Sequence, residues 1–233
     1  PTFILKRDPA LEGRFLLEPM GPLFRLRPRP WMAPAPRSSR LYRPLDLSRW
    51  GNADYLHDPS YPNPTLGPDL FSGLKPGTLL WKKVPFQIAP PYGSSYVPPV
   101  LSLCFQLGTE IEIPLEGRPT DEVWFLLDGS GFGASPGPAG WIGVRLADGL
   151  TIGRPLRAME DVWDYENRRF GTPLPDQALA FGQMGEQSLI AWGLALPPRS
   201  LPRSLILKSL AADQAGRAPA GFIVFAVTQA LSR

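Results

Sequence analysis

The chain has 233 residues, of which 30 are Pro, 43% are hydrophobic and 11% are aromatic. This apolar content excludes a fully disordered chain, and the high Pro content disfavours long helices. A single Cys excludes an internal disulfide framework and a Cys-rich zinc site. The net charge of +3 is uneven, because residues 1–44 hold nine Lys or Arg against three acidic residues, whereas residues 45–233 have an acidic excess.

Residues 1–44 are predicted to form an extended docking arm. Nine of these residues are Pro, and Pro-rich segments favour extended or polyproline backbone. A short helix over residues 9–17, capped by Asp8, is an alternative for part of the arm. Large apolar side chains recur along the arm, so we expect it to lie in a groove of this protein or of a neighbour. The residues expected to bind the partner are Phe15, Phe24, Arg25, Arg27, Arg29 and Trp31.

From residue 45 onward, short apolar segments between Gly, Pro and Asp turns predict β-strands. The segments are 78–82, 85–88, 100–106, 110–113, 122–127, 140–146, 151–155, 189–196, 204–209 and 221–228. Asp148-Gly149 predicts a hairpin, the alternation over 110–113 predicts a strand with one solvated face, and the apolar run 222–227 predicts a central strand. We therefore predict one all-β domain over residues 45–233, a β-sandwich of jelly-roll type.

The order of several motifs resembles that of galactose-binding-like jelly-roll modules. The motifs are 44–48, 74–77, 84–88, 123–127, 144–149, 161–163, 190–198, 204–209 and 225–228. Such modules occur as accessory domains beside bacterial glycoside hydrolases and in other extracytoplasmic proteins. The resemblance spans residues 44–229 and implies the sandwich fold and an extracytoplasmic location, in the periplasm or at the cell surface. The chain departs from it at Leu196-Pro197-Pro198, where the modules often have Asn-Pro, and at Asp128, where His is common.

The sequence holds no recognisable catalytic arrangement. A hydrolytic triad needs a base beside a nucleophile, but His57 is the only His and no activated Ser motif is present. The glycines around Gly131 lack the Lys-Ser/Thr step of a phosphate-binding loop. We therefore predict that the protein is not an enzyme, and a glycosidase that uses Asp161 and Asp164 is the least favoured reading.

The acidic and aromatic stretch 160–166 is the densest candidate for ligand binding. A turn that packs on the sandwich is the default reading, and a sugar site is the alternative. The candidate ligand-binding residues are Tyr55, Asp161, Trp163, Asp164 and Tyr165. Asn52, Asp54 and Asp58 supply oxygen ligands suited to a structural Ca²⁺ ion, and no other cofactor is expected.

The combined features predict a non-catalytic structural or docking subunit of a larger assembly, extracytoplasmic or membrane-associated. The arm and the sandwich surface would bind protein partners, and the basic arm also suits an anionic membrane surface. A carbohydrate-binding module is the alternative function, because aromatic residues recur in the predicted loops. Nucleic acid is disfavoured as a partner, since the body is net acidic and contains no known nucleic-acid module.

Overall fold

The computed structural model describes residues 15–20, 23–28, 41–53, 71, 73–90, 100–103, 109–130, 138–158, 160–162, 178–181, 187–209 and 221–232. Two compact units divide the chain, Pro1–Ala33 and Pro34–Arg233. In the smaller unit, β1 (Phe15–Met20) pairs antiparallel with β2 (Leu23–Pro28). The alternative of a helix over 9–17 is wrong for Phe15 to Leu17, because these residues belong to β1 and pair with β2.

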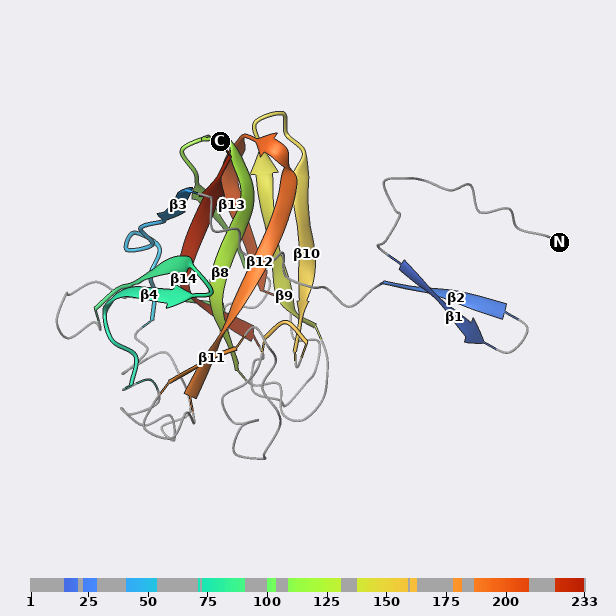
Figure 1. Cartoon of the computed structure of the whole chain (residues 1–233), viewed down its shortest axis with the longest axis horizontal. Coiled ribbons are helices and arrows are strands. Elements are labelled where there is room, and N and C mark those ends of the chain that lie inside the picture. The colour runs from blue at the N-terminus through green and yellow to red at the C-terminus, as the bar shows by residue number, and fades with distance from the viewer. Residues whose placement is uncertain are drawn as a thin grey trace. The chain divides into compact units, whose positions relative to one another are not determined.

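The larger unit contains two antiparallel sheets in separate layers (Figure 1). The four-stranded sheet has the order β10 (Thr151–Arg157), β9 (Pro138–Leu146), β13 (Pro202–Ser209), β7 (Glu110–Pro114). The six-stranded sheet has the order β11 (Ala178–Phe181), β12 (Gln187–Ser200), β8 (Thr120–Ser130), β14 (Gly221–Leu231), β3 (Leu41–Pro44), and β6 (Leu101–Ser102) also pairs with β14. No helix occurs among these described residues.

The chain passes repeatedly from one sheet to the other. It changes sheet at each step from β7 to β8 to β9, and again from β12 to β13 to β14, whereas β9–β10 and β11–β12 are hairpins within one sheet. The two layers are in contact. The ring of Phe222 on β14 packs against Gly140 on β9 so closely that a Cβ atom added to Gly140 would lie only 2.2 Å from the ring. The described unit is thus all-β and sandwich-like.

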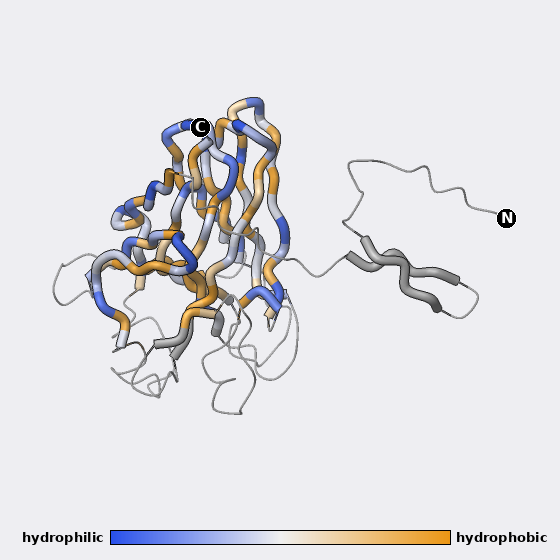
Figure 2. The backbone as a smooth tube through the Cα atoms, in the orientation of Figure 1, coloured by the Kyte–Doolittle hydropathy of each residue, from blue (hydrophilic) through white to orange (hydrophobic). Residues whose placement is uncertain are grey.

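A third, two-stranded sheet covers part of the outer face of the six-stranded sheet. It consists of β4 (Gly77–Trp81) and β5 (Val84–Ile88). The ring centres of Trp81 on β4 and Trp124 on β8 lie 5.4 Å apart, and the Thr228 hydroxyl on β14 donates to the Pro85 carbonyl at 2.5 Å. Strands β8 and β14 are therefore buried on both faces, and apolar residues follow these strands in Figure 2.

Several local predictions are confirmed. β9 and β10 form the expected hairpin, in which Gly149 has a φ of +88° and the Leu150 amide donates to the Asp148 carboxylate at 3.0 Å. In β7, Glu110 and Glu112 are exposed while Ile113 is buried. The apolar run from residue 222 to 227 lies in β14, between β8 and β3.

Residues 41–44, which the sequence prediction assigns to the arm, are part of the larger unit. They form β3, which pairs with β14 from Leu41 opposite Leu231 to Pro44 opposite Thr228. The next residue continues the contact, since the Leu45 amide donates to the Val227 carbonyl at 2.8 Å. A Pro is tolerated in β3 because β3 is an edge strand of the sheet, where a missing backbone N–H interrupts no hydrogen bonds between strands.

Candidate functional site

The register of β1 and β2 divides their residues between two faces. Residues paired across an antiparallel hairpin share a face, and successive residues alternate between the faces. One face holds only apolar residues, in the pairs Phe15–Pro28, Leu17–Leu26 and Pro19–Phe24. The other face is mixed, with the pairs Leu16–Arg27, Glu18–Arg25 and Met20–Leu23. We call these the apolar face and the mixed face of the hairpin.

The predicted partner-binding residues fall on both faces. Phe15 and Phe24 occupy positions on the apolar face, whereas Arg25 and Arg27 occupy positions on the mixed face. Arg29 and Trp31 lie outside the described residues. The sequence prediction identified residue types suited to docking, but it did not separate the aromatic from the basic positions, because that separation depends on the pairing register.

Asp161 lies in the turn after β10 and is 5% exposed. Its Oδ1 accepts a hydrogen bond from the Arg154 guanidinium and one from the Trp192 indole N–H at 3.3 Å. Its Oδ2 accepts one from the Arg157 amide at 3.0 Å and a longer one from Arg154 at 3.4 Å. Both carboxylate oxygens are therefore engaged, and the carboxylate ties the turn to β10 and to β12.

The Arg154 guanidinium completes this cluster. It lies 4.7 Å from the centre of the Trp192 ring, within cation–π range. Burial lowers the pKa of Arg154, because burial penalises the charged form, and the Asp161 carboxylate opposes that shift. The arrangement stabilises the turn at an inter-sheet contact. Trp163, Asp164 and Tyr165, predicted as ligand-binding residues together with Asp161, lie outside the described residues, as does Tyr55.

Asn52 serves as a structural link. Its side-chain amide donates to the Ser102 carbonyl at 2.9 Å, and its side-chain oxygen accepts from the Ser102 amide at 2.7 Å. The side chain thus imitates a paired strand residue and holds the segment after β3 to β6. Asp54 and Asp58, the other predicted calcium ligands, lie outside the described residues. Within the described part of the chain, His, Cys, Asp and Glu side chains form no group of three or more that could hold a metal ion.

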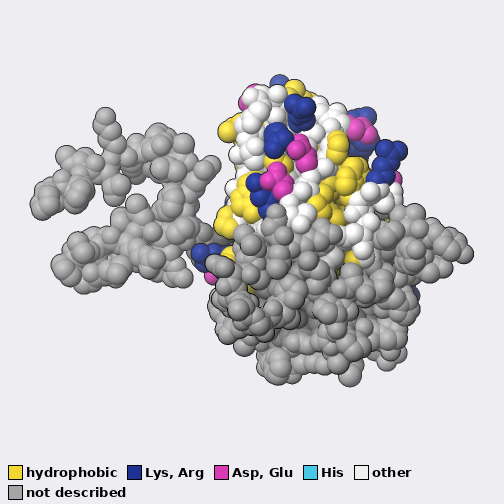
Figure 3. All heavy atoms as spheres, turned by 180° about the vertical axis from the view of Figure 1, so that it is seen from behind, with side chains coloured by type: hydrophobic (Ala, Val, Ile, Leu, Met, Phe, Trp, Pro, Cys, Tyr) yellow, Lys and Arg dark blue, Asp and Glu magenta, His cyan; other side chains and the backbone are white. Residues whose placement is uncertain are grey.

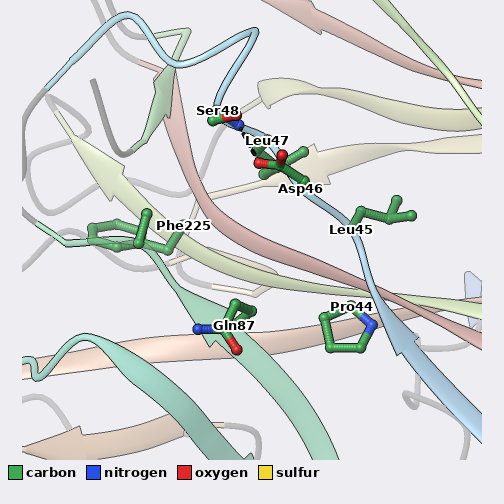
Figure 4. Close-up of a pocket in the computed structure, with 8 residues that line it drawn as sticks. Pro44, Leu45, Asp46, Leu47, Ser48, Gln87 and Phe225 are labelled. Carbon is green, nitrogen blue, oxygen red and sulfur yellow. Dashed lines mark hydrogen bonds between the residues drawn. The ribbon is translucent and has the colours of Figure 1, made fainter. Parts of the chain in front are cut away.

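A small cavity opens beside the segment that follows β3 (Figure 4). Its volume is about 220 Å³, and its lining residues are Pro44, Leu45, Asp46, Leu47, Ser48, Gln87, Ala89 and Phe225. The Asp46 carboxylate accepts the Ser48 amide at 2.9 Å, and this hydrogen bond lowers the pKa of Asp46. The Gln87 side-chain oxygen accepts from the Thr78 hydroxyl at 3.3 Å. Asp46 and Gln87, two polar residues of the lining, are thus each hydrogen-bonded to a neighbouring residue.

The comparisons with known proteins assign the chain to no family. No protein-family model matches it, and it has no match among the curated proteins or the solved structures. In the described segments there is no helix long and apolar enough to cross a membrane.

Proposed function

We propose that the protein is a non-catalytic docking subunit that binds a partner protein through the apolar face of the β1–β2 hairpin. The observation that carries the proposal is the register, which gathers six apolar residues on one face of a hairpin in a unit of its own. A two-stranded hairpin alone is marginally stable in water at best. An apolar face of this kind gains stability when a partner covers it.

The charges of the arm indicate the character of the partner surface. Residues 1–40, the arm without β3, have a formal charge of +5, from eight basic and three acidic residues. Two of the basic residues, Arg25 and Arg27, occupy the mixed face. We therefore expect an apolar groove with an acidic rim, since complementary charge speeds and orients association. The resemblance to accessory modules of extracytoplasmic proteins supports an assembly outside the cytoplasm.

A pair of matched double variants tests the proposal. The tagged full-length chain is used to recover partners from extracts of its source. Leu17→Ser with Leu26→Ser removes two large apolar residues from the apolar face, and Leu16→Ser with Met20→Ser removes two from the mixed face. We expect the first variant to lose a specific partner and the second to retain it. A synthetic peptide spanning residues 14–29 should compete for the same partner.

Equal recovery of the partner by the two double variants would contradict the proposal. The circular dichroism and thermal unfolding of each variant serve as controls, since both should match the wild type if the larger unit folds independently of the hairpin face. Retention of the partner after deletion of residues 1–33 would exclude the hairpin as the docking element.

A further inference from the structure

Three exposed leucines lie at one end of the larger unit. Among the described residues, the exposed large hydrophobic side chains are those of Leu41, Leu80, Leu150 and Leu201. Leu150 ends the β9–β10 turn, and Leu201 forms the turn between β12 and β13. The two turns are in contact, because the Ala147 amide donates to the Leu201 carbonyl at 2.8 Å. Leu150 and Leu201 therefore lie on neighbouring turns.

Leu41 belongs to the same end through the six-stranded sheet. It pairs with Leu231 on β14, and Leu231 pairs with Thr120 at the start of β8. On its other side Thr120 pairs with Ser200, the residue before Leu201. In Figure 1 the C-terminus and the turns β9–β10 and β12–β13 share the upper end of the larger unit. Three of the four exposed leucines are therefore found at this end.

The turn that carries Leu150 is closed by its own hydrogen bonds. The Leu146 amide donates to the Leu150 carbonyl at 2.8 Å, and the Gly149 amide donates to the Leu146 carbonyl at 3.0 Å. The Leu150 amide donates to the Asp148 carboxylate at 3.0 Å. Because these backbone groups already have partners, moving the turn from water into a less polar layer leaves few of them unsatisfied.

Two arginines flank the leucines. Arg199 and Arg203 lie just before and just after Leu201, both are exposed, and neither forms an ion pair with another described residue. Figure 3, which views the larger unit from behind, shows hydrophobic and basic side chains mixed toward this end. We call this group of residues the leucine end; its members are Leu41, Leu150, Arg199, Leu201 and Arg203.

The acidic side chains in segments 115–121 and 147–150, which also lie at this end, already have partners. Glu116 pairs with both Arg43 and Arg118. Asp121 accepts the Arg199 amide at 3.1 Å, and Asp148 accepts the Leu150 amide. The guanidinium groups of Arg199 and Arg203 are therefore available to an anionic partner from outside the chain.

Arg199 lies in a bulge of β12. In the pairing with β8, residues 196–199 of β12 lie opposite Asp121 alone. The φ angle of Arg199 is +57°, in the left-handed region that Gly adopts without strain. Residues held in such conformations are concentrated at functional sites. The bulge thus presents a strained Arg two residues before the exposed Leu201.

We propose that the leucine end binds the surface of an anionic lipid bilayer. Its leucines project from two turns and a strand end, an arrangement that suits a deformable surface better than a fixed pocket. Apolar side chains are stabilised at the boundary between headgroups and acyl chains, and arginines are attracted to anionic headgroups there. These residues belong to the larger unit, so the proposal depends neither on the docking hairpin nor on the basic arm.

Flotation of the full-length chain with lipid vesicles tests this proposal. The vesicles contain phosphatidylcholine alone or phosphatidylcholine mixed with phosphatidylglycerol. We expect the wild type to bind the mixed vesicles far more tightly than the neutral ones. Leu150→Ser with Leu201→Ser should weaken binding to the mixed vesicles by about tenfold, because the apolar contribution at the interface is lost. Arg199→Gln with Arg203→Gln should weaken it by about tenfold through the lost attraction to anionic headgroups.

Matched variants of the β4–β5 hairpin serve as controls. Leu80→Ser removes a leucine that is 66% exposed, and Lys82→Gln with Lys83→Gln removes two exposed cations. Both control variants should bind the mixed vesicles as the wild type does. Thermal unfolding of all four variants should match that of the wild type, since every substituted side chain is exposed.

The proposal is overturned if the wild type binds neither kind of vesicle. It is also overturned if the leucine double variant binds as the wild type does, because the basic arm would then account for the binding, or if the control variants lose as much affinity. Leucine-end variants that keep vesicle binding but lose a protein that copurifies with the wild type would assign this end to a protein partner instead.

Discussion

The hairpins β4–β5 and β1–β2 are similar in length but belong to different units of the chain. In β4–β5, one face holds Trp81, Val84, Phe86 and Ile88, all at most 6% exposed, while Leu80 on the other face is 66% exposed. In β1–β2, the register produces a comparable division, with apolar residues on one face and a mixed set on the other. The face of β4–β5 is covered by the six-stranded sheet, as the contact of Trp81 with Trp124 shows.

The comparison shows that the amphipathic hairpin β4–β5 packs its apolar face against another sheet of the protein. β4–β5 is itself only two strands, and its stability depends on burial against β8 and β14 rather than on its own cross-strand bonds. The hairpin β1–β2 belongs to the other unit of the chain. Our proposal assigns its apolar face to a partner protein, which would take the role that the six-stranded sheet plays for β4–β5.

The largest expected effect comes from breaking the covered face of β4–β5. Phe86 is fully buried, so Phe86→Ala should reduce the free energy of unfolding by about 3–5 kcal/mol through lost burial and a cavity. Leu80→Ala, on the exposed face of the same hairpin, should change it by no more than about 0.5 kcal/mol. Chemical denaturation measures both, and equal losses would contradict the assignment of the two faces.

The anchored turn after β10 provides the next test of how the larger unit is held together. Asp161→Asn removes the charge that faces the Arg154 guanidinium, whose side chain is 21% exposed, and the free energy of unfolding should fall by about 3 kcal/mol. Asp148→Asn changes an exposed carboxylate in the β9–β10 turn and serves as the control. A thermal shift for Asp161→Asn no greater than that of the control would show that the cluster is not a structural anchor.

The smallest effect concerns the turn of the covered hairpin. Lys82 and Lys83 connect β4 to β5 with φ angles of 42° and 80°, a conformation that Gly adopts without strain. Lys83→Gly should therefore raise the free energy of unfolding by about 0.5–1 kcal/mol. Lys75→Gly, at an exposed position outside the positive-φ set, should lower it slightly. A loss of stability in Lys83→Gly would contradict the strain in this turn.

Local patterns were sufficient to predict much of the larger unit. The alternation in β7 and the Asp148-Gly149 turn are properties of adjacent residues, and both predictions are confirmed. The turn at Lys82 and Lys83 has no such signal, since two Lys residues are unusual in a positive-φ turn. The sequence prediction includes β3 in the arm because residues 1–44 as a whole are Pro-rich and basic. The place of β3 in the sheet depends on its pairing with β14, nearly the whole chain length away.

The candidate sites depended still more on distant partners. The sequence groups Asn52 with nearby acidic residues as a possible calcium ligand, and it gives no sign of the hydrogen bonds that join Asn52 to Ser102, fifty residues later. The sequence predicts Trp141 only as part of a strand, because the contact of its ring with Gly153 depends on which strand lies beside β9 in the sheet. A single strand sequence carries no information about which residues will lie beside it in the sheet.

Hydrogen–deuterium exchange at residues 15–28 tests the docking claim most directly. The amides of β1 and β2 are compared in the isolated full-length chain and in the assembly purified with its partner. The account predicts fast exchange in the isolated chain and strong protection in the assembly, because covering the apolar face stabilises a hairpin that is marginal alone. Equal exchange of these amides in both samples would contradict it.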